Sequence, residues 1–182
     1  MTGRRLGLSG SAGTGKTTLG RKLAATLDLP YIPEGMRTYL ERTGADLHAL
    51  GTAGLRSLVL QLWDEQRAAE DDALSRSGGF VVDRCSFDFA AFWIYYGFAG
   101  AEPQTERIFA EVLDPRRYDA VWLLPWGQFP VEADGVRTSK PYLQLHVHVL
   151  IEGMLHRGGA PLRHVTARSV EDRVTEIVRG LA

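Results

Sequence analysis

The chain has 182 residues, of which 45% are hydrophobic, and its formal net charge is −1. This length suits one α/β domain with a full core, and the balanced charge excludes the broad basic field that nucleic-acid binding needs. A single cysteine, Cys85, excludes an internal disulfide, and the most apolar stretch, residues 87–99, is too short for a membrane span and carries Asp88. Because the N-terminus runs directly into a strand pattern and not into an apolar signal segment, we expect a cytoplasmic protein with small-molecule ligands.

Apolar runs and helical periodicity alternate along the whole chain, and no repeat or linker divides it, so we treat residues 1–182 as a single domain. The predicted strands are residues 5–9, 29–33, 80–82, 120–124 and 161–165. A predicted helix follows the first strand, and further helices are expected at residues 34–42, 52–77, 87–98, 103–113 and 142–156 and after the N-cap residue Ser169. This order predicts a three-layer α/β fold with a five-stranded parallel sheet and right-handed crossovers.

A phosphate-binding P-loop, or Walker A motif, lies between the first strand and the first helix. Residues 10–17 match the pattern G-x-x-x-x-G-K-[ST]. Its glycines let backbone N–H groups wrap a phosphate, Lys16 brings a positive charge to the outer phosphates, and Thr17 offers a hydroxyl to Mg²⁺. The motif therefore predicts binding of ATP with Mg²⁺ in a P-loop NTPase fold. The predicted nucleotide-binding residues are Gly10, Ser11, Ala12, Gly13, Thr14, Gly15, Lys16, Thr17 and Thr18.

Acidic residues follow the second and third predicted strands, at the sheet edge where ligands of parallel sheets bind. Asp83 is expected to face Thr17 across a magnesium ion; its alternative role is to cap the next helix. Glu34 can accept the proton of a substrate hydroxyl as that hydroxyl attacks the γ-phosphate; its alternative is an exposed acid at a helix start. Arg37 and Arg84 fit equally well as contacts to the substrate or the transferring phosphoryl group and as structural ion-pair partners.

The segment of about residues 126–141 is rich in glycine, proline and charge, and it is long for a connection without regular structure. Such segments often act as lids over an active site. We expect Arg137 to reach the phosphates from this lid and to stabilise the charge that develops during transfer. The alternative is a solvated loop charge.

Weaker signals surround these residues. Gln66 can hydrogen-bond a substrate amide or base edge, although surface glutamines are common. The ring of Trp93 can form a wall against a flat base, but its helical spacing with Phe89 and Tyr96 is more typical of a core. His146 and His148 are two residues apart in a predicted helix, point to different faces and do not predict a metal site between them.

Taken in order, these motifs resemble small P-loop kinases similar to the ribosylnicotinamide kinase domain of bacterial NadR proteins and to related AAA-type ATPases. The likeness covers nearly the whole chain. It rests on residues 10–17, Glu34-Gly-Met-Arg37-Thr-Tyr-Leu-Glu41, Val81-Val82-Asp83-Arg84, Asp134-Gly-Val-Arg137 and Ser169-Val-Glu-Asp-Arg173-Val.

The resemblance implies phosphoryl transfer to a hydroxyl, with Glu34 as the base, Asp83 as the acid beside magnesium, and the adenine against residues 166–168, including Arg168. The assignments of Glu34 and Asp83 can be exchanged. The chain departs from NadR in carrying no nucleotidylyltransferase domain ahead of these motifs, and its substrate pocket is the least matched region.

We therefore expect an ATP-dependent kinase that acts on a hydroxyl of a nucleoside-like molecule, such as nicotinamide riboside, another nucleoside or a specialised metabolite. One alternative is a nucleoside monophosphate kinase, for which Arg37, Arg42 and Arg84 would supply cations. Another is a regulatory ATPase switch without an acceptor. The N-K-x-D segment of GTPases and the L-S-G-G-Q signature of ABC ATPases are both absent from the sequence. No nucleic-acid or membrane partner is expected, and the sequence leaves a homodimer open.

Overall fold

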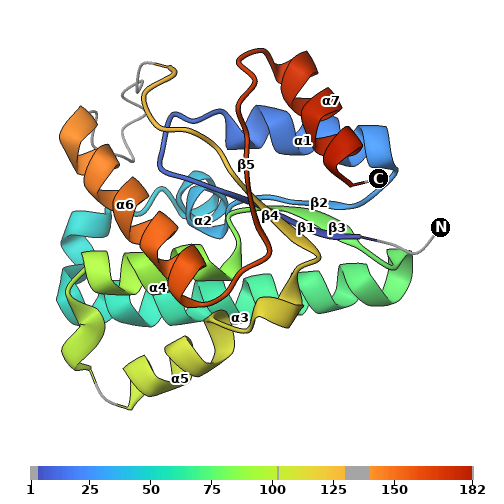
Figure 1. Ribbon diagram of the computed structural model, residues 1–182. Coiled ribbons are helices and arrows are strands. Elements are labelled where there is room, and N and C mark those ends of the chain that lie inside the picture. The colour runs from blue at the N-terminus through green and yellow to red at the C-terminus, as the bar shows by residue number, and fades with distance from the viewer. Residues whose placement is uncertain (1–3, 102, 130–139, 182) are drawn as a thin grey trace.

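The computed structural model describes residues 4–101, 103–129 and 140–181. Its centre is a five-stranded sheet in the order β2-β3-β1-β4-β5, in which all neighbouring strands are parallel (Figure 1). Leu6 of β1 lies opposite Val81 of β3 on one side and Ala120 of β4 on the other. The predicted sheet is therefore confirmed. The strands are β1 (Arg5–Ser9), β2 (Tyr31–Ile32), β3 (Phe80–Asp83), β4 (Ala120–Leu123) and β5 (Leu162–His164).

Helices cover both faces of this sheet, which makes three layers (Figure 1). Helices α1 and α7 lie on one face, while α3, α4 and α6 lie on the other, with α5 outside them. The helices are α1 (Lys16–Leu27), α2 (Gly35–Thr43), α3 (Gly51–Ser77), α4 (Ser86–Tyr95), α5 (Gln104–Val112), α6 (Pro141–Arg157) and α7 (Val170–Gly180). Short 3-10 turns occur at Leu47–Leu50, Phe98–Gly100 and Pro115–Arg117.

Successive side chains of a strand point to opposite faces of the sheet, so each strand contributes to the core on both faces. Alternate residues such as Leu6, Leu8 and Trp122 pack with α1 and α7. Val82 and Leu123 belong to the cluster that also contains residues of α4 and α6. Because both faces are covered, the strands read as nearly continuous apolar runs, as parallel strands do.

Most predicted boundaries agree with the structure because local chemistry determines them. Gly44 and Gly78 end α2 and α3 in the left-handed conformation, with φ of 63° and 72°. The hydroxyl of Ser169 accepts the N–H of Asp172 and caps α7, as expected. The prediction of a strand over residues 29–33 was too long. Proline at positions 30 and 33 flanks the two residues of β2, and proline has no N–H for sheet pairing.

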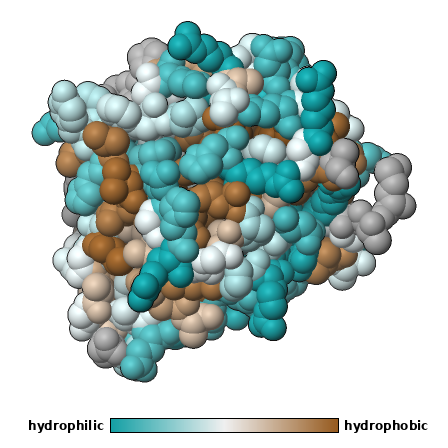
Figure 2. All heavy atoms as spheres, viewed as in Figure 1, coloured by the Kyte–Doolittle hydropathy of each residue, from teal (hydrophilic) through white to brown (hydrophobic). Residues whose placement is uncertain are grey.

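The surface is mixed in character. Figure 2 shows hydrophobic side chains on the side of the molecule where α6 lies, among larger hydrophilic areas. Tyr142, Leu143 and Val149 are the exposed large hydrophobic residues of α6. Within the described ranges, no helix combines the length and the hydropathy that a membrane crossing requires.

The close approach of β1 and β3 gives the first prediction. A Cβ atom on Gly79 would overlap the backbone N and O of Arg4, whose carbonyl accepts the N–H of Phe80 at 2.8 Å. Gly79→Ala should therefore lower the free energy of unfolding by about 1–3 kcal/mol, measured by denaturant unfolding. As a control, Gly153→Ala in α6 meets no atom within 4 Å and should be neutral or stabilising by up to about 1 kcal/mol. Equal stability of the two variants would contradict this account.

Candidate active site

The predicted site residues gather at the carboxyl end of three adjacent strands. The P-loop follows β1, Glu34 follows β2, and Asp83 and Arg84 lie at the end of β3, with β3 between the other two strands (Figure 1). Since parallel strands end at the same edge, residues far apart in the sequence meet here. The strand order therefore decides that Asp83 and Arg84 lie between Glu34 and the P-loop.

The P-loop has the backbone conformation that its glycines permit. Gly10, Gly13 and Gly15 have φ of 132°, 74° and 86°, values that side chains with a Cβ rarely adopt. A Cβ on Gly10 would also lie 2.9 Å from the carbonyl oxygen of Leu124. The buried hydroxyl of Ser11 has no hydrogen-bond partner among the residues described, which fits a loop shaped to receive a polar ligand such as phosphate.

Lys16 starts α1 and folds its side chain back over the loop. Its Nζ donates to the carbonyl oxygens of Gly10 at 2.8 Å and Ser11 at 2.7 Å, and to Oγ1 of Thr14 at 3.3 Å. The side chain is buried, so its charge lies inside the curve of the loop. This position suits a lysine that compensates phosphate charge.

Thr17 and Asp83 form the part of the site that fits a magnesium ion. Thr17 Oγ1 donates to Asp83 Oδ2 at 2.6 Å, and the hydroxyl of Tyr31 donates to the same oxygen at 3.1 Å. Burial, together with the charge of Asp83, raises the pKa of Tyr31, so this phenol stays a donor. The other oxygen, Asp83 Oδ1, is buried and accepts no hydrogen bond from the described part of the chain. An unsatisfied carboxylate oxygen beside a threonine hydroxyl is a donor set that Mg²⁺ accepts.

Arg84 joins the elements of the site. Its guanidinium donates to Glu34 Oε1 at 2.7 Å, Asp88 Oδ1 at 3.2 Å and the carbonyl oxygen of Gly10 at 3.1 Å. Burial by itself lowers the pKa of this guanidinium, but the carboxylates of Glu34 and Asp88 outweigh it and raise the pKa above its ordinary value. Arg84 is thus a fixed positive charge. Its ion pairs match the structural alternative we considered, and contact with a phosphoryl group stays a prediction.

Three residues that the sequence analysis did not assign to the site hold the P-loop and its surroundings. Asp88 accepts the hydroxyl of Ser9 at 2.7 Å; its place three residues after the cap residue Cys85 was the available signal. Gln144 of α6 accepts the N–H of Ala12 at 3.1 Å, and no sequence signal pointed to it.

Arg173 of α7 is the third of these residues. It donates to the carbonyl oxygens of Thr14 at 2.8 Å and Ala167 at 2.9 Å, and to the side chain of Gln128 at 2.6 Å. It ties the P-loop to the loops after β4 and β5. In the sequence, only the family resemblance, through the segment Ser169-Val-Glu-Asp-Arg173-Val, pointed to Arg173.

The remaining predicted residues are exposed or half-buried, or they lie outside the described residues. Thr18 is exposed in the first turn of α1, Arg37 is half-buried on α2, and Arg168 is exposed in the loop after β5. Carboxylate oxygens of Glu176 accept the backbone N–H groups of residues 166 and 167 and so shape that loop. Arg137 and residues 130–139 of the predicted lid lie outside the described residues.

The structure changes the interpretation of Gln66 and Trp93 as substrate contacts. Trp93 is fully buried, packs with Phe98 and donates its indole N–H to Thr105 at 2.9 Å, which favours the core alternative. Gln66 is buried too, and its amide donates to Glu70 Oε1 at 2.8 Å and to the carbonyl oxygen of Arg84 at 3.0 Å. Gln66 therefore stabilises the backbone of the site at Arg84.

Together, the parallel sheet and the loop wrapped around Lys16 define a P-loop NTPase with a kinase-like fold. The chain belongs to a family described as AAA domain, whose model matches residues 5–173. No curated protein matches it.

Solved structures with this fold include several kinases. A structure of NadR in complex with NR has a TM-score of 0.75 and 18% identity, covering 99% of this chain and 49% of NadR. Deoxyadenosine kinase from M. mycoides has a TM-score of 0.71 and 15% identity, covering 97% of this chain and 98% of its own. For thymidylate kinase from Ehrlichia chaffeensis the TM-score is 0.65 and the identity 15%, with complete coverage of both chains.

These comparisons confirm the predicted resemblance to NadR-like P-loop kinases and the predicted fold class. This chain spans about half the length of NadR. At such identities the likeness to solved structures shows a shared fold.

The position of Gln66 gives the second prediction. Gln66→Leu keeps the approximate size but removes the amide that donates to Glu70 and to the carbonyl of Arg84, so the free energy of unfolding should fall by about 1–3 kcal/mol. Gln61→Leu on the same helix is the control, because the amide of Gln61 donates to Glu65 at the exposed surface, and it should change stability by less than about 0.5 kcal/mol. Unchanged stability of the Gln66 variant in denaturant unfolding would contradict this supporting role.

Proposed function

We propose that the protein is an ATP- and Mg²⁺-dependent kinase that transfers the γ-phosphoryl group to a hydroxyl of a nucleoside-like small molecule. The observation that carries this proposal is the buried Glu34–Arg84 pair at 2.7 Å, with Arg84 also bound to the P-loop carbonyl of Gly10. A carboxylate beside the P-loop suits an enzyme that activates an acceptor. A switch that only hydrolyses ATP has no need of an acceptor site.

The donor side of the site would be held by the P-loop. Backbone N–H groups of residues 10–17 and Lys16 would bind the β- and γ-phosphates, while Thr17 and Asp83 would hold magnesium. When bound, Mg²⁺ supplies positive charge that offsets the phosphate oxygens. The loop at residues 166–168, with Arg168, would border the adenine, and Arg137 would act from the lid.

On the acceptor side, Glu34 would act as the general base. The acceptor oxygen forms a bond to the γ-phosphorus, the bond to the leaving ADP oxygen breaks, and the hydroxyl proton passes to the Glu34 carboxylate. Asp83 suits this role less well, because its Oδ2 already accepts two hydroxyl groups and its Oδ1 would face magnesium. Glu34 instead lies beside the fixed positive charge of Arg84. Arg37, one helical turn along α2, would contact the substrate.

The charges of the site favour an uncharged hydroxyl over a phosphate as acceptor. Arg84 already faces Glu34 and Asp88, so its charge is compensated within the protein. A nucleoside monophosphate kinase would rely instead on Arg37 and Arg42, and the thymidylate kinase fold keeps this alternative in view. NadR was solved with NR, and nicotinamide riboside is accordingly one candidate acceptor. A cytoplasmic location is part of this proposal, and a homodimer is left open.

The third prediction tests the reaction itself. ATP consumption with Mg²⁺ should depend on one acceptor in a panel of nucleosides, nicotinamide riboside, nucleoside monophosphates and aminoglycoside-like metabolites, and mass spectrometry should show one added phosphoryl group. Lys16→Ala should abolish transfer because the loop loses its cation. Lys22→Ala is the control, since Lys22 pairs with Glu171 away from the loop. Slow ATP loss that no acceptor accelerates would favour the regulatory ATPase.

The fourth prediction concerns the base. Glu34→Gln should lower kcat by about 10²- to 10⁴-fold because the amide cannot take the hydroxyl proton, while KM for ATP changes little. Glu41→Gln, an exposed acid on the same helix, should leave both constants unchanged. An equal loss of kcat and ATP affinity in the Glu34 variant would argue against its role as base.

A further inference from the structure

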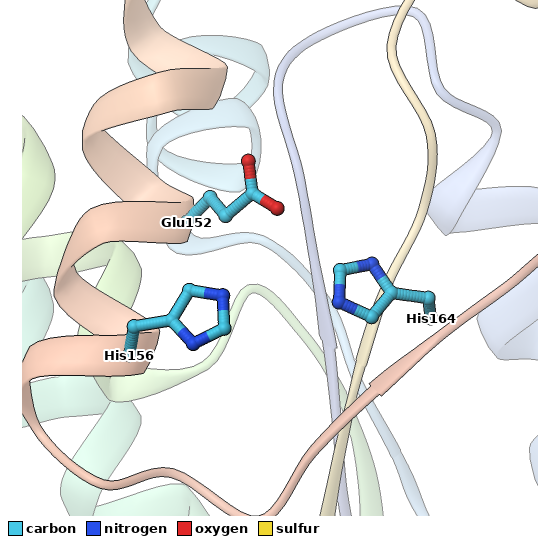
Figure 3. Close-up of side chains that lie close together, drawn as sticks. All are labelled: Glu152, His156 and His164. Atoms are coloured by element: carbon cyan, nitrogen blue, oxygen red, sulfur yellow. The ribbon is translucent and has the colours of Figure 1, made fainter.

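Three potential metal ligands converge on the side of the molecule where α6 passes β5. Glu152 and His156 lie one turn apart on α6, and His164 is the last residue of β5. One ligand atom from each side chain lies within 4.8 Å of the other two. Figure 3 shows Glu152 and His156 projecting from the helix toward the space that the ring of His164 borders.

The chemistry of this set selects a class of metal. Two imidazole nitrogens and one carboxylate oxygen form a ligand set that zinc accepts, whereas Mg²⁺ prefers oxygen ligands alone. Around a tetrahedral zinc ion with bonds of about 2.0–2.1 Å, ligand atoms lie about 3.3 Å apart. The three ligand atoms now lie within 4.8 Å of one another, and small side-chain rotations would bring them to the shorter distance that zinc requires. The spacing of four residues on a helix places Glu152 and His156 on the same face, as a shared ion requires.

The three side chains are also available for binding. In residues 4–101, 103–129 and 140–181, none of the three side chains makes a hydrogen bond or an ion pair. Both histidines are exposed, so a metal ion can reach them from solvent. Such ligands at close range favour binding, because an ion displaces no side-chain hydrogen bond or ion pair among the described residues.

We propose that Glu152, His156 and His164 form a zinc-class transition-metal site that links α6 to β5, with the fourth position open to water. The site differs from the predicted magnesium site in its ligands and in its elements. It does not depend on the proposed kinase activity. Strand β5 lies at the edge of the sheet and pairs only with β4 among the described strands. A bound metal ion would attach β5 to α6, the helix whose Gln144 contacts the P-loop.

The fifth prediction tests this site on the tag-free, metal-free protein. Titration with ZnCl₂ should raise the melting temperature, because an ion that binds only the folded state stabilises it, whereas MgCl₂ at the same concentration should not reproduce the shift. Co²⁺ should give the visible absorption of a tetrahedral site containing nitrogen ligands. His164→Asn should lose the shift and weaken zinc binding, measured by calorimetry, at least about tenfold.

His146→Asn is the matched control, since His146 lies on α6 but contacts the ring of Tyr95. This variant should bind zinc as the original protein does. The proposal is overturned if the original protein shows no saturable zinc binding, or if His164→Asn binds zinc as tightly as His146→Asn. Circular dichroism at the start of each titration verifies that the variants are folded. None of these measurements requires a phosphorylated product, so they stay separate from the test of the kinase.

Discussion

The site depends on the buried guanidinium of Arg84. Arg84 lies between the carboxylates of Glu34 and Asp88 and also binds the carbonyl of Gly10, so one guanidinium connects β1, β2, β3 and α4. Removing one member of such a buried pair typically costs about 3–5 kcal/mol, because an uncompensated charge remains. The backbone of Arg84 has φ of 78°, a conformation that costs about 1–2 kcal/mol for a residue other than glycine. The ion pairs are thus made by a residue whose own backbone conformation is disfavoured.

The backbone at Arg84 is fixed from both sides. Its N–H donates to the carbonyl of Leu8 at 2.9 Å, and its carbonyl accepts the amide of Gln66. Gln66 is in turn held by Glu70, whose carboxylate also accepts the hydroxyl of Tyr118 at 2.9 Å and pairs with Arg117. Burial raises the pKa of Glu70, and Arg117 opposes this effect. A polar network below the sheet edge thus supports the turn that presents Asp83 and Arg84.

Two helices from late in the chain complete the support of the P-loop. Gln144 at the start of α6 accepts a loop N–H, and Arg173 of α7 donates to a loop carbonyl. The two helices approach from opposite faces of the sheet. The loop is therefore held from outside at Ala12 and Thr14, while Lys16 binds it from inside. Positioning of this kind matters for phosphoryl transfer, in which most of the catalysis comes from orientation and charge.

The sequence alone determined the features that depend on neighbouring residues. Apolar runs identified the strands. Gly44 and Gly78 marked the ends of two helices, and Ser169 marked the start of a third. The motif at residues 10–17 identified the phosphate loop. Asp83 was predicted from its place at a strand end, and its hydrogen bond with Thr17 agrees with that placement. These patterns are local, and backbone geometry translates them directly into structure.

Only the tertiary structure decided which distant residues meet. Glu34 and Arg84 are 50 residues apart, Ala12 and Gln144 are 132 apart, and Thr14 and Arg173 are 159 apart. The same holds for the convergence of Glu152 and His156 with His164, and for the inward direction of Gln66. A sequence pattern gives the face of an element on which a side chain lies, but its contacts depend on strand order and on the packing of helices across the sheet.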